Sequence, residues 1–235
     1  GADVNAANDR GHTALMMAAA NGVTTNEEAA IEIVRLLVSK GAHLEAADED
    51  QRTALFLAAM AGNGAMVRTL VSLGAALEAA DKIKFTALMA AAASGELKAL
   101  DVLIEAKGNL EAAHEKGGTA LIAASAAGSR GAVELLLNNT HGRKADVGAV
   151  DEDGDTALHL AVMRGHYDVI IILLRHGADP NVANKEGITP LAWAEQRGER
   201  LPHMAELLQT GGDLDKVKGF LSRLVQASRE AEAAS

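Results

Sequence analysis

The chain contains no cysteine among its 235 residues, and it has only five aromatic residues and three prolines. Without cysteine there is no disulfide framework and no thiol nucleophile, which is compatible with a reducing compartment. Apolar residues nevertheless make up 49% of the chain. The core must therefore be filled by Ala, Leu, Val, Ile and Met, a composition that suits closely packed short helices better than a sheet sandwich.

Two further features are missing, a long apolar run and an excess of positive charge. No apolar run approaches the roughly 20 residues that span a bilayer, and no signal peptide opens the chain. The 32 acidic and 22 basic residues give a net charge of −10, which disfavours nonspecific attraction to nucleic acid or anionic lipid. We therefore expect a soluble protein of the cytoplasm or nucleus that neither inserts into a membrane nor binds nucleic acid.

A short segment that reads TAL or TPL recurs along the chain. Its six copies begin at Thr13, Thr53, Thr86, Thr119, Thr156 and Thr189. The successive spacings are 40, 33, 33, 37 and 33 residues. A period near 33 residues is therefore the organising feature of the sequence, and periods of this size indicate stacked repeats.

The most regular unit, residues 151–183, predicts two short helices. Thr156 can cap the first helix with its hydroxyl group, and Gly165 ends it. A second apolar stripe starts at Val169 and predicts another helix, which Gly177 stops. Two such short helices cannot bury their apolar faces alone, so the units must stack on one another.

This unit resembles an ankyrin repeat. The family pattern is D-x-x-G-x-T-P-L-H-x-A-A-x-x-G-H, then a V/I-x-x-L-L helix and G-A-D-x-N, and the unit departs from it mainly at Ala157 and Val162. The resemblance covers residues 1–212. It implies an all-α solenoid of helix-turn-helix units joined by β-hairpin-like loops, and a protein-binding function without catalysis.

We divide the chain into six repeats and a C-terminal cap. Residues 1–7 read as the end of a repeat whose helices are missing, so we expect a fragment of a longer array. The repeats then span residues 8–47, 48–80, 81–113, 114–150, 151–183 and 184–212. Residues 213–235 are expected to form a capping helix and a frayed tail that begins at Arg229. The apolar stripe of this helix is Leu214, Val217, Leu221 and Leu224, flanked by Phe220 and Val225.

The first and last repeats depart from the regular unit. The first is seven residues longer, and Thr25 and Glu28 stand at capping-box spacing within the extra segment. We expect this segment to extend the second helix at its N-terminus. In the last repeat, Pro202 can begin the second helix.

Three positions that normally hold glycine are occupied by other residues. Lys107 stands where a glycine usually stops the second helix, and we expect Gly108 to take the left-handed conformation instead. Gln51 and Lys84 replace turn glycines, so the second and third hairpins are candidates for bending.

The hairpin tips precede each threonine, and in ankyrin proteins partners usually lie against these tips and the inner face of the first helices. Most tip residues here are charged, as solvated loops should be. Ile83 and Phe85 are exceptions, and two interpretations are open. They can anchor a partner, or they can pack on an adjacent hairpin.

The inner face of the first helices is small and apolar in the middle, with arginines toward one end. An extended peptide or a helix could approach closely there, with its acidic groups meeting the arginines. The candidate partner-binding residues are Arg52, Met60, Ile83, Phe85, Asp155, Met163, Arg164 and Arg197. We interpret Trp193 as a structural residue of the terminal repeat.

The histidines offer little chemistry. His159 and His166 occupy positions where the family pattern has histidine, so we expect hydrogen bonds between neighbouring repeats. No His, Cys and carboxylate set has zinc-ligand spacing, and no nucleophile has a recognisable base. We expect no catalytic residue, metal, cofactor or small-molecule substrate.

Asn5 and Asn181 stand at the G-A-D-x-N position, which in this family can be a site of asparaginyl hydroxylation. We favour a turn asparagine that holds the backbone.

The resemblance implies a protein-binding scaffold that holds a partner segment on its concave, inner face. Two alternatives stay open: a permanently bound subunit or module of a large assembly, and a regulatory array of a larger enzyme or channel. The surfaces of ankyrin repeats diverge freely while their cores repeat, so the identity of the protein partner cannot be read from the family.

Overall fold

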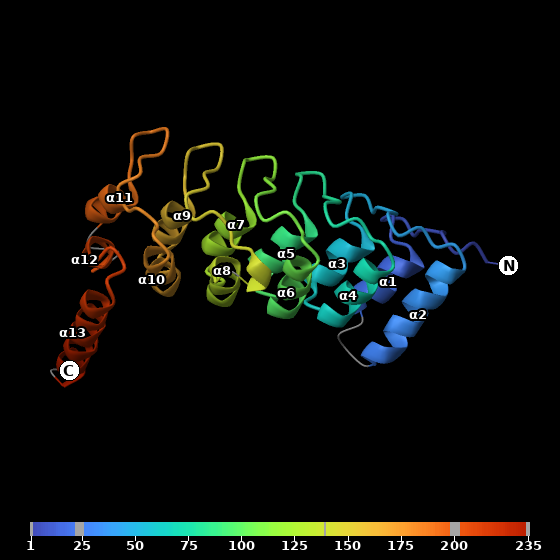
Figure 1. Cartoon of the computed structure of the whole chain (residues 1–235), viewed down its shortest axis with the longest axis horizontal. Helices are drawn as coiled ribbons and strands as arrows, with labels where there is room; N and C mark the ends of the chain where they lie inside the picture. Colours follow the sequence, from blue (N-terminus) through green and yellow to red (C-terminus); the bar gives the residue numbers. More distant parts are fainter. Residues whose placement is uncertain (1, 22–25, 139, 198–202, 234–235) are drawn as a thin grey trace.

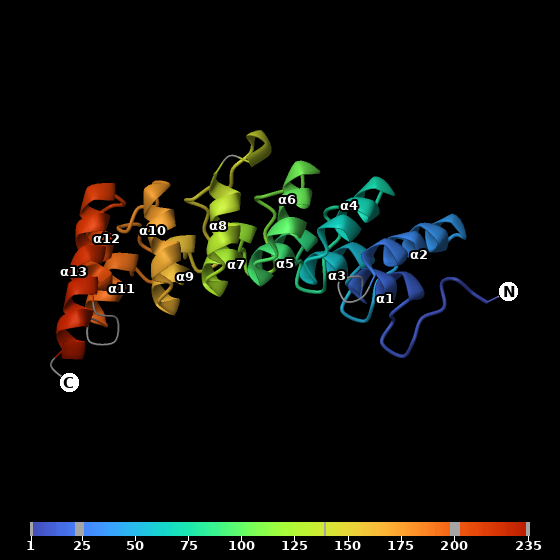
Figure 2. The same ribbon diagram turned by 90° about the horizontal axis from the view of Figure 1, so that it is seen from below.

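The computed structural model describes residues 2–21, 26–138, 140–197 and 203–233, and these ranges contain helices and turns but no strand. The repeats stack in single file, so that their helices form two rows, and hairpin-like loops project from one side (Figure 1). The two termini lie at opposite ends of the molecule (Figures 1 and 2). The predicted all-α solenoid is confirmed.

Each repeat contributes one helix to each row. The first helices are α1 (Ala14–Asn21), α3 (Ala54–Met60), α5 (Ala87–Ser94), α7 (Ala120–Ala127), α9 (Ala157–Arg164) and α11 (Pro190–Gln196). The second helices are α2 (Glu27–Ser39), α4 (Gly64–Ser72), α6 (Leu97–Glu105), α8 (Arg130–Leu137), α10 (Tyr167–Arg175) and α12 (Met204–Gln209). A short 3-10 turn, η1 (Thr140–Gly142), follows α8, and a longer helix, α13 (Leu214–Ala233), follows α12.

The threonines begin the first helices as predicted. In all six repeats the threonine hydroxyl accepts a hydrogen bond from the backbone N–H three residues later, at 3.0–3.5 Å. This bond satisfies one of the amide groups that a helix leaves unpaired at its start. At the other end, Gly95, Gly128 and Gly165 have φ values of 72°, 72° and 76° and close α5, α7 and α9 in the left-handed conformation.

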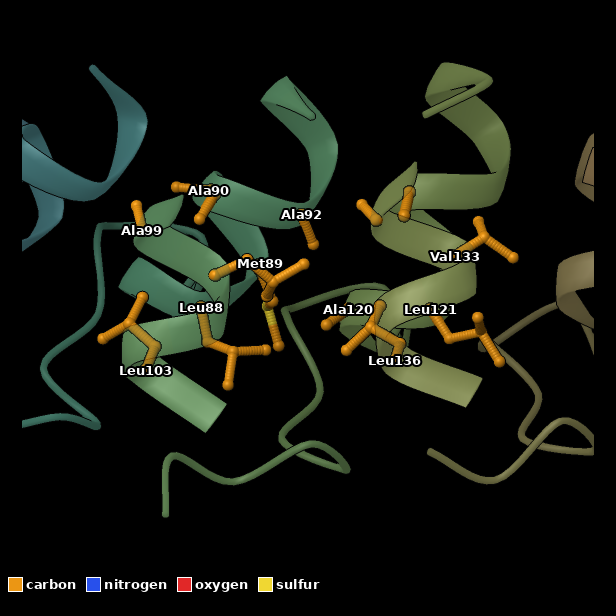
Figure 3. Close-up of a cluster of buried hydrophobic side chains, with 14 of the residues drawn as sticks. Leu88, Met89, Ala90, Ala92, Ala99, Leu103, Ala120, Leu121, Val133 and Leu136 are labelled. Atoms are coloured by element: carbon orange, nitrogen blue, oxygen red, sulfur yellow. The ribbon is translucent and has the colours of Figure 1, made fainter. Parts of the chain in front are cut away.

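The first helices are built so that repeats can approach closely. Every residue from Ala87 to Ala92 in α5 is buried, and four of these six are alanine. Figure 3 shows Leu88 beside Leu103 within one repeat, and Leu121 beside Leu136 within the next. Small residues on the first helix and larger aliphatic residues between the two helices therefore fill most of the core, and Phe56 and Phe220 are the aromatic side chains buried in it among the described residues.

Main-chain hydrogen bonds join each hairpin to the one before it. The N–H groups of Glu49, Lys82, Glu115, Glu152 and Lys185 donate to the carbonyls of Arg10, Asp50, Ile83, Lys116 and Asp153, at 2.7–3.2 Å. Inside a hairpin, a side-chain acceptor such as Asp81 Oδ1 takes the N–H groups of Ile83 and Phe85, at 2.9 and 2.8 Å. The hairpins are thus held mostly by backbone groups and by one side-chain acceptor at their base, which is an acidic or amide residue except in the fourth hairpin, where it is His114.

The prediction that Gly108 takes the left-handed conformation is wrong. Lys107 itself has φ 70°, close to the 95° and 90° of Gly74 and Gly177, which occupy the same position in other repeats. Gly108 stands where the second and fifth repeats have Ala75 and Ala178, and here the space for a methyl group is small. A Cβ there would lie 2.9 Å from Leu88 Cδ1 and 3.1 Å from the carbonyl oxygen of Leu103. The connection to the next repeat imposes the left-handed conformation on whichever residue stands at position 107.

The second and third hairpins are not bent by the loss of their glycines. Gln51 and Lys84 have φ values of 65° and 61°, near the 78° of Gly117 and Gly154 at the same position. The possibility of bending left open by the sequence is therefore excluded, because both residues adopt the backbone conformation that the turn needs.

The extra residues of the first repeat lengthen its second helix. α2 has 13 residues, whereas α10 has nine, and the four additional residues are at the N-terminus. Asn26 caps α2 by accepting a hydrogen bond from the N–H of Ala29 at 3.1 Å. Thr25 and Pro202 lie outside the described residues, and α12 begins at Met204, after His203.

At the C-terminal end, α13 lies against α12 (Figures 1 and 2). Val217 and Phe220 are its buried residues among those whose side chains are described, and Phe220 lies edge-on to His203 with ring centroids 6.4 Å apart. The predicted stripe is wrong at Leu221, which is exposed while its neighbour Phe220 points inward. α13 continues to Ala233, so the segment from Arg229 is helical, and its predicted fraying stays a prediction.

α2 lies at the N-terminal end of the second row (Figure 2). It exposes two residues whose equivalents are buried in α4, α6 and α10, and in α8 are the buried Ala132 and the partly buried Leu135. Ile33 and Leu36 are 50% and 58% exposed. The residues in register with them in α4, α6 and α10 are Met66 and Thr69, Ala99 and Val102, and Val169 and Ile172, all 0–6% exposed. Burial at these positions therefore depends on a neighbour on the N-terminal side.

This difference predicts unequal costs for equivalent substitutions. Ile172→Ala removes buried methyl groups beside α8 and should lower the free energy of unfolding by about 2–4 kcal/mol. Leu36→Ala, at the same register but in water, should change it by less than about 0.5 kcal/mol. Urea unfolding followed by circular dichroism measures both. Equal losses would contradict the register assigned to α2.

The strained lysine gives a second prediction. Lys107→Gly should raise the free energy of unfolding by roughly 1 kcal/mol, because glycine has no Cβ to oppose φ 70°. The matched control is Gly177→Ala, where φ is 90° and no atom lies within 4 Å of the added Cβ. It should destabilise by a similar amount through the backbone alone, as measured by the same unfolding experiment.

Candidate functional site

Four of the eight predicted binding residues lie on hairpins: Arg52, Ile83, Phe85 and Asp155. The other four lie at or just beyond the C-terminal ends of first helices: Met60 in α3, Met163 and Arg164 in α9, and Arg197 after α11. We call the surface formed by the hairpins and the exposed side of the first helices the inner surface. All eight residues belong to these elements, but the structure does not bring all eight together.

Ile83 and Phe85 occupy different environments. Ile83 is 50% exposed at the tip of its hairpin. Phe85 is partly buried, and its ring lies 5.7 Å from the imidazole of His114 on the next hairpin, tilted by 50°. Phe85 therefore packs between hairpins, whereas Ile83 remains free to contact a partner.

Arg52 is engaged within its own hairpin. Its Nε donates to Asp48 Oδ2 at 2.9 Å, and a terminal nitrogen lies 3.0 Å from Asp50 Oδ2. Asp48 is buried and also accepts the backbone N–H groups of Asp50 and Arg52, at 2.9 and 2.8 Å. Burial raises the pKa of Asp48, but the backbone and side-chain donors of Arg52, with its charge, outweigh this effect and lower the pKa below its ordinary value.

The lowered pKa predicts how acid affects stability. A carboxylate whose folded pKa is depressed stabilises the fold above its unfolded pKa of about 3.9, and this contribution is lost as pH falls through the folded pKa. In Asp48→Asn the amide oxygen can still accept both backbone N–H groups, as Asn184 Oδ1 does in the last hairpin. The variant should be less stable than the parent near pH 6, on the order of 1 kcal/mol.

The difference between the two proteins should shrink as pH falls below about 4. Thermal unfolding from pH 6 to pH 2 measures this convergence. A difference that is constant across the whole pH range would show that the charge of Asp48 does not stabilise the hairpin.

Two exposed methionines lie at equivalent positions of the inner surface. Met60 in α3 and Met163 in α9 are each seven residues after the capping threonine, and they are 42% and 43% exposed. Between them the same position holds Ala93 and Ala126. The first helices thus carry flexible apolar side chains at two places, separated by small residues.

A cavity of about 280 Å³ lies between the fifth and sixth hairpins and the helices α9 and α11. Its lining includes Asp153, Asp155, His159, Met163, Glu186 and Trp193. It thus brings together two predicted residues, Asp155 and Met163. Arg197 is linked to it indirectly, because its guanidinium lies 4.3 Å from the centre of the Trp193 ring. We call this cavity the fifth-repeat pocket.

The sequence interpretation missed Trp193 as part of a candidate site. The signal available was that it is the only tryptophan of the chain and stands in a first helix, at the position occupied by Leu57 and Ala90 in other repeats. A much larger side chain at this position both packs on the core and reaches the neighbouring hairpin.

Comparison with known proteins explains the periodicity. The family model for ankyrin repeats matches three stretches of the chain, residues 1–81, 74–145 and 140–218. The chain belongs to the ankyrin repeat family. Ankyrin repeats are in general protein-interaction modules and not enzymes.

A crystal structure of an ankyrin repeat domain from Acinetobacter baumannii AYE is similar to the chain, with a TM-score of 0.70 and 33% sequence identity. The match covers 84% of this chain and 97% of that one.

Curated relatives match over shorter stretches. Potassium channel AKT3 of Oryza sativa subsp. japonica is 49% identical over 51 residues, 22% of this chain and 6% of that protein. Ankyrin repeat and SOCS box protein 6 of Mus musculus is 43% identical over 61 residues, 26% of this chain and 15% of that protein. The similarity to these proteins is therefore confined to a small part of their length.

The ankyrin-type histidines join neighbouring repeats, as predicted. His159 Nδ1 accepts the backbone N–H of Thr156 at 3.1 Å, so the neutral ring carries its proton on Nε2, which donates to the carbonyl of Ile188 in the next repeat at 3.1 Å. His166 Nε2 bonds the carbonyl of Ala126 in the preceding repeat at 3.2 Å. Both rings are thereby committed to stacking the repeats.

The asparagine of the ankyrin G-A-D-x-N segment holds the backbone in the first unit. Asn5 donates to the carbonyl of Gly41 at 3.1 Å and accepts the N–H of His43 at 2.9 Å. Asn181 instead bonds Asp179, at 2.8 and 3.1 Å. Three repeats have glutamate at this position, and Glu45, Glu78 and Glu111 accept a backbone N–H of the following repeat at 2.8–2.9 Å.

In the described ranges, no group of three or more His, Cys, Asp or Glu side chains is placed to hold a metal ion. Among the helices of the same ranges, none is both long enough and apolar enough to cross a bilayer.

Proposed function

We propose that the chain is a non-catalytic scaffold that holds a segment of a partner protein against its inner surface. The observation that carries this proposal is the exposure of Met60, Ile83 and Met163, which are 42–50% accessible and lie on the hairpins and first helices. Exposed apolar side chains at positions that do not build the core are typical of binding surfaces.

Charged groups surround these apolar side chains. Arg164 is exposed at the end of α9, and Arg197 is exposed after α11 while it stacks on Trp193. Acidic groups of a partner could pair with these two arginines. Phe85 is better regarded as a support for the third hairpin, because it already packs on His114.

Selection from a display library of random peptides tests the proposal without knowledge of the natural partner. Selected peptides should bind the parent chain and bind Ile83→Ser, Met60→Ser or Met163→Ser at least about fivefold more weakly, the loss expected when a contact of about 1 kcal/mol is removed. Isothermal titration calorimetry measures the affinities.

The matched control is Leu97→Ser. Leu97 is 45% exposed, as much as the two methionines, but it lies in α6 in the second row of helices. Its substitution should leave peptide binding unchanged. If Leu97→Ser weakens binding and the three inner-surface variants do not, the partner lies on the opposite side and the proposal is wrong.

The alternative of a module fixed in a larger assembly is favoured by one observation, the exposure of Ile33 and Leu36 at the N-terminal end of the stack. A permanently bound neighbour could cover them. Analytical ultracentrifugation separates the two functions, since a clean monomer favours the exchangeable scaffold and self-association favours the fixed module. A location in the cytoplasm or nucleus stays a prediction.

A further inference from the structure

We propose that the fifth-repeat pocket selects one long basic side chain, lysine or arginine, from the partner segment. This inference rests on the proposed function and names the chemistry of one contact.

The walls of the pocket are apolar where a side-chain stem would lie. Met163, Pro190 and Trp193 line it from α9 and α11. The methylene groups of a lysine or arginine pack well against such surfaces while the charged end remains near polar groups. A volume of about 280 Å³ is sufficient for one side chain and too small for a folded element.

The walls are acidic where the charged end would lie. Asp153, Asp155 and Glu186 line the pocket, opposed by the ammonium group of Lys185 in its lining and by the guanidinium of Arg197 against the Trp193 ring. Within the described residues, the side chains of Asp153 and Glu186 form no ion pair. Two carboxylates are therefore available to a cation from outside, and an acidic side chain would be repelled.

Asp155 is positioned before any partner arrives. It is 9% exposed, and Asn184 Nδ2 donates to its Oδ1 at 2.8 Å. His159 Nε2 lies 3.9 Å from the same oxygen but is hydrogen-bonded to the carbonyl of Ile188, and its Nδ1 accepts the N–H of Thr156. A preorganised carboxylate loses little entropy when it binds a cation.

The fifth hairpin differs from the others in its charge. Between its base and the threonine it carries Glu152, Asp153 and Asp155 and no basic residue. The hairpins of the first four repeats all contain a basic residue, at Arg10, Arg52, Lys82, Lys84 and Lys116. The acidic pocket is thus a property of the junction between the fifth and sixth repeats and not of the whole array.

The single tryptophan makes the pocket directly observable. Fluorescence of Trp193 can be titrated with N-acetyl-arginine amide, N-acetyl-lysine amide and the uncharged N-acetyl-norleucine amide at constant ionic strength. We expect a saturable change with at least one basic probe and none with norleucine. Comparison of the two basic probes shows whether the pocket prefers a guanidinium or an ammonium group.

The double variant Asp153→Asn, Glu186→Gln should weaken binding of the basic probe about tenfold, as expected for the loss of a charge-assisted hydrogen bond. The matched control is Asp9→Asn, Glu49→Gln, which changes the net charge equally on two exposed residues of the first and second hairpins. It should bind as the parent does. All four substituted side chains are exposed, and far-UV circular dichroism checks that both variants are folded.

Two results would overturn the inference: no saturable response to either basic probe, or equal affinities in the two double variants. Neither depends on the peptide selection described above. If selected peptides bind the inner surface but the probes do not bind, the pocket assignment fails and the scaffold function stands. If the probes bind and no peptide does, the pocket stands and the scaffold function fails.

Discussion

Stacking between neighbouring repeats is the interaction on which the whole structure depends. Two helices of eight or nine residues cannot bury their apolar faces against each other, so every repeat completes its core with residues of the next. Alanine in the first helices permits close approach, and backbone hydrogen bonds continue the contact through the hairpins. Ile33 and Leu36 illustrate the same dependence on a neighbouring repeat, because they are exposed where no repeat covers them.

This requirement divides the residues of the chain into two groups. The threonine caps, the inter-repeat histidines His159 and His166 and the acceptor at the base of each hairpin hold the repeats together. Side chains at the hairpin tips and on the open side of the first helices do not, so they can carry the chemistry of recognition. The fifth-repeat pocket uses both groups, since Asp155 is fixed by Asn184 of the next repeat while Asp153 stays free.

The repeat register made the fold predictable from sequence. The errors concern residues whose backbone conformation or burial is imposed by other parts of the structure. The threonine caps, the starts of the first helices and the inter-repeat histidines follow from local patterns, and they were predicted correctly. Lys107 and Gly108 were exchanged because glycine is normally the residue that tolerates a positive φ, whereas the connection between repeats imposes it by position. Leu221, Phe85 and Trp193 could not be assigned because their environments depend on contacts with other elements, which periodicity does not report.

The hydrogen bonds between hairpins are formed by main-chain atoms. The fold can therefore stay the same while the binding specificity changes. A substitution at a hairpin tip alters neither the donor nor the acceptor of these main-chain hydrogen bonds. The tips can therefore change in the course of evolution with little loss in the free energy of unfolding. One array of this kind can therefore give rise to descendants with different partners while their scaffold stays the same.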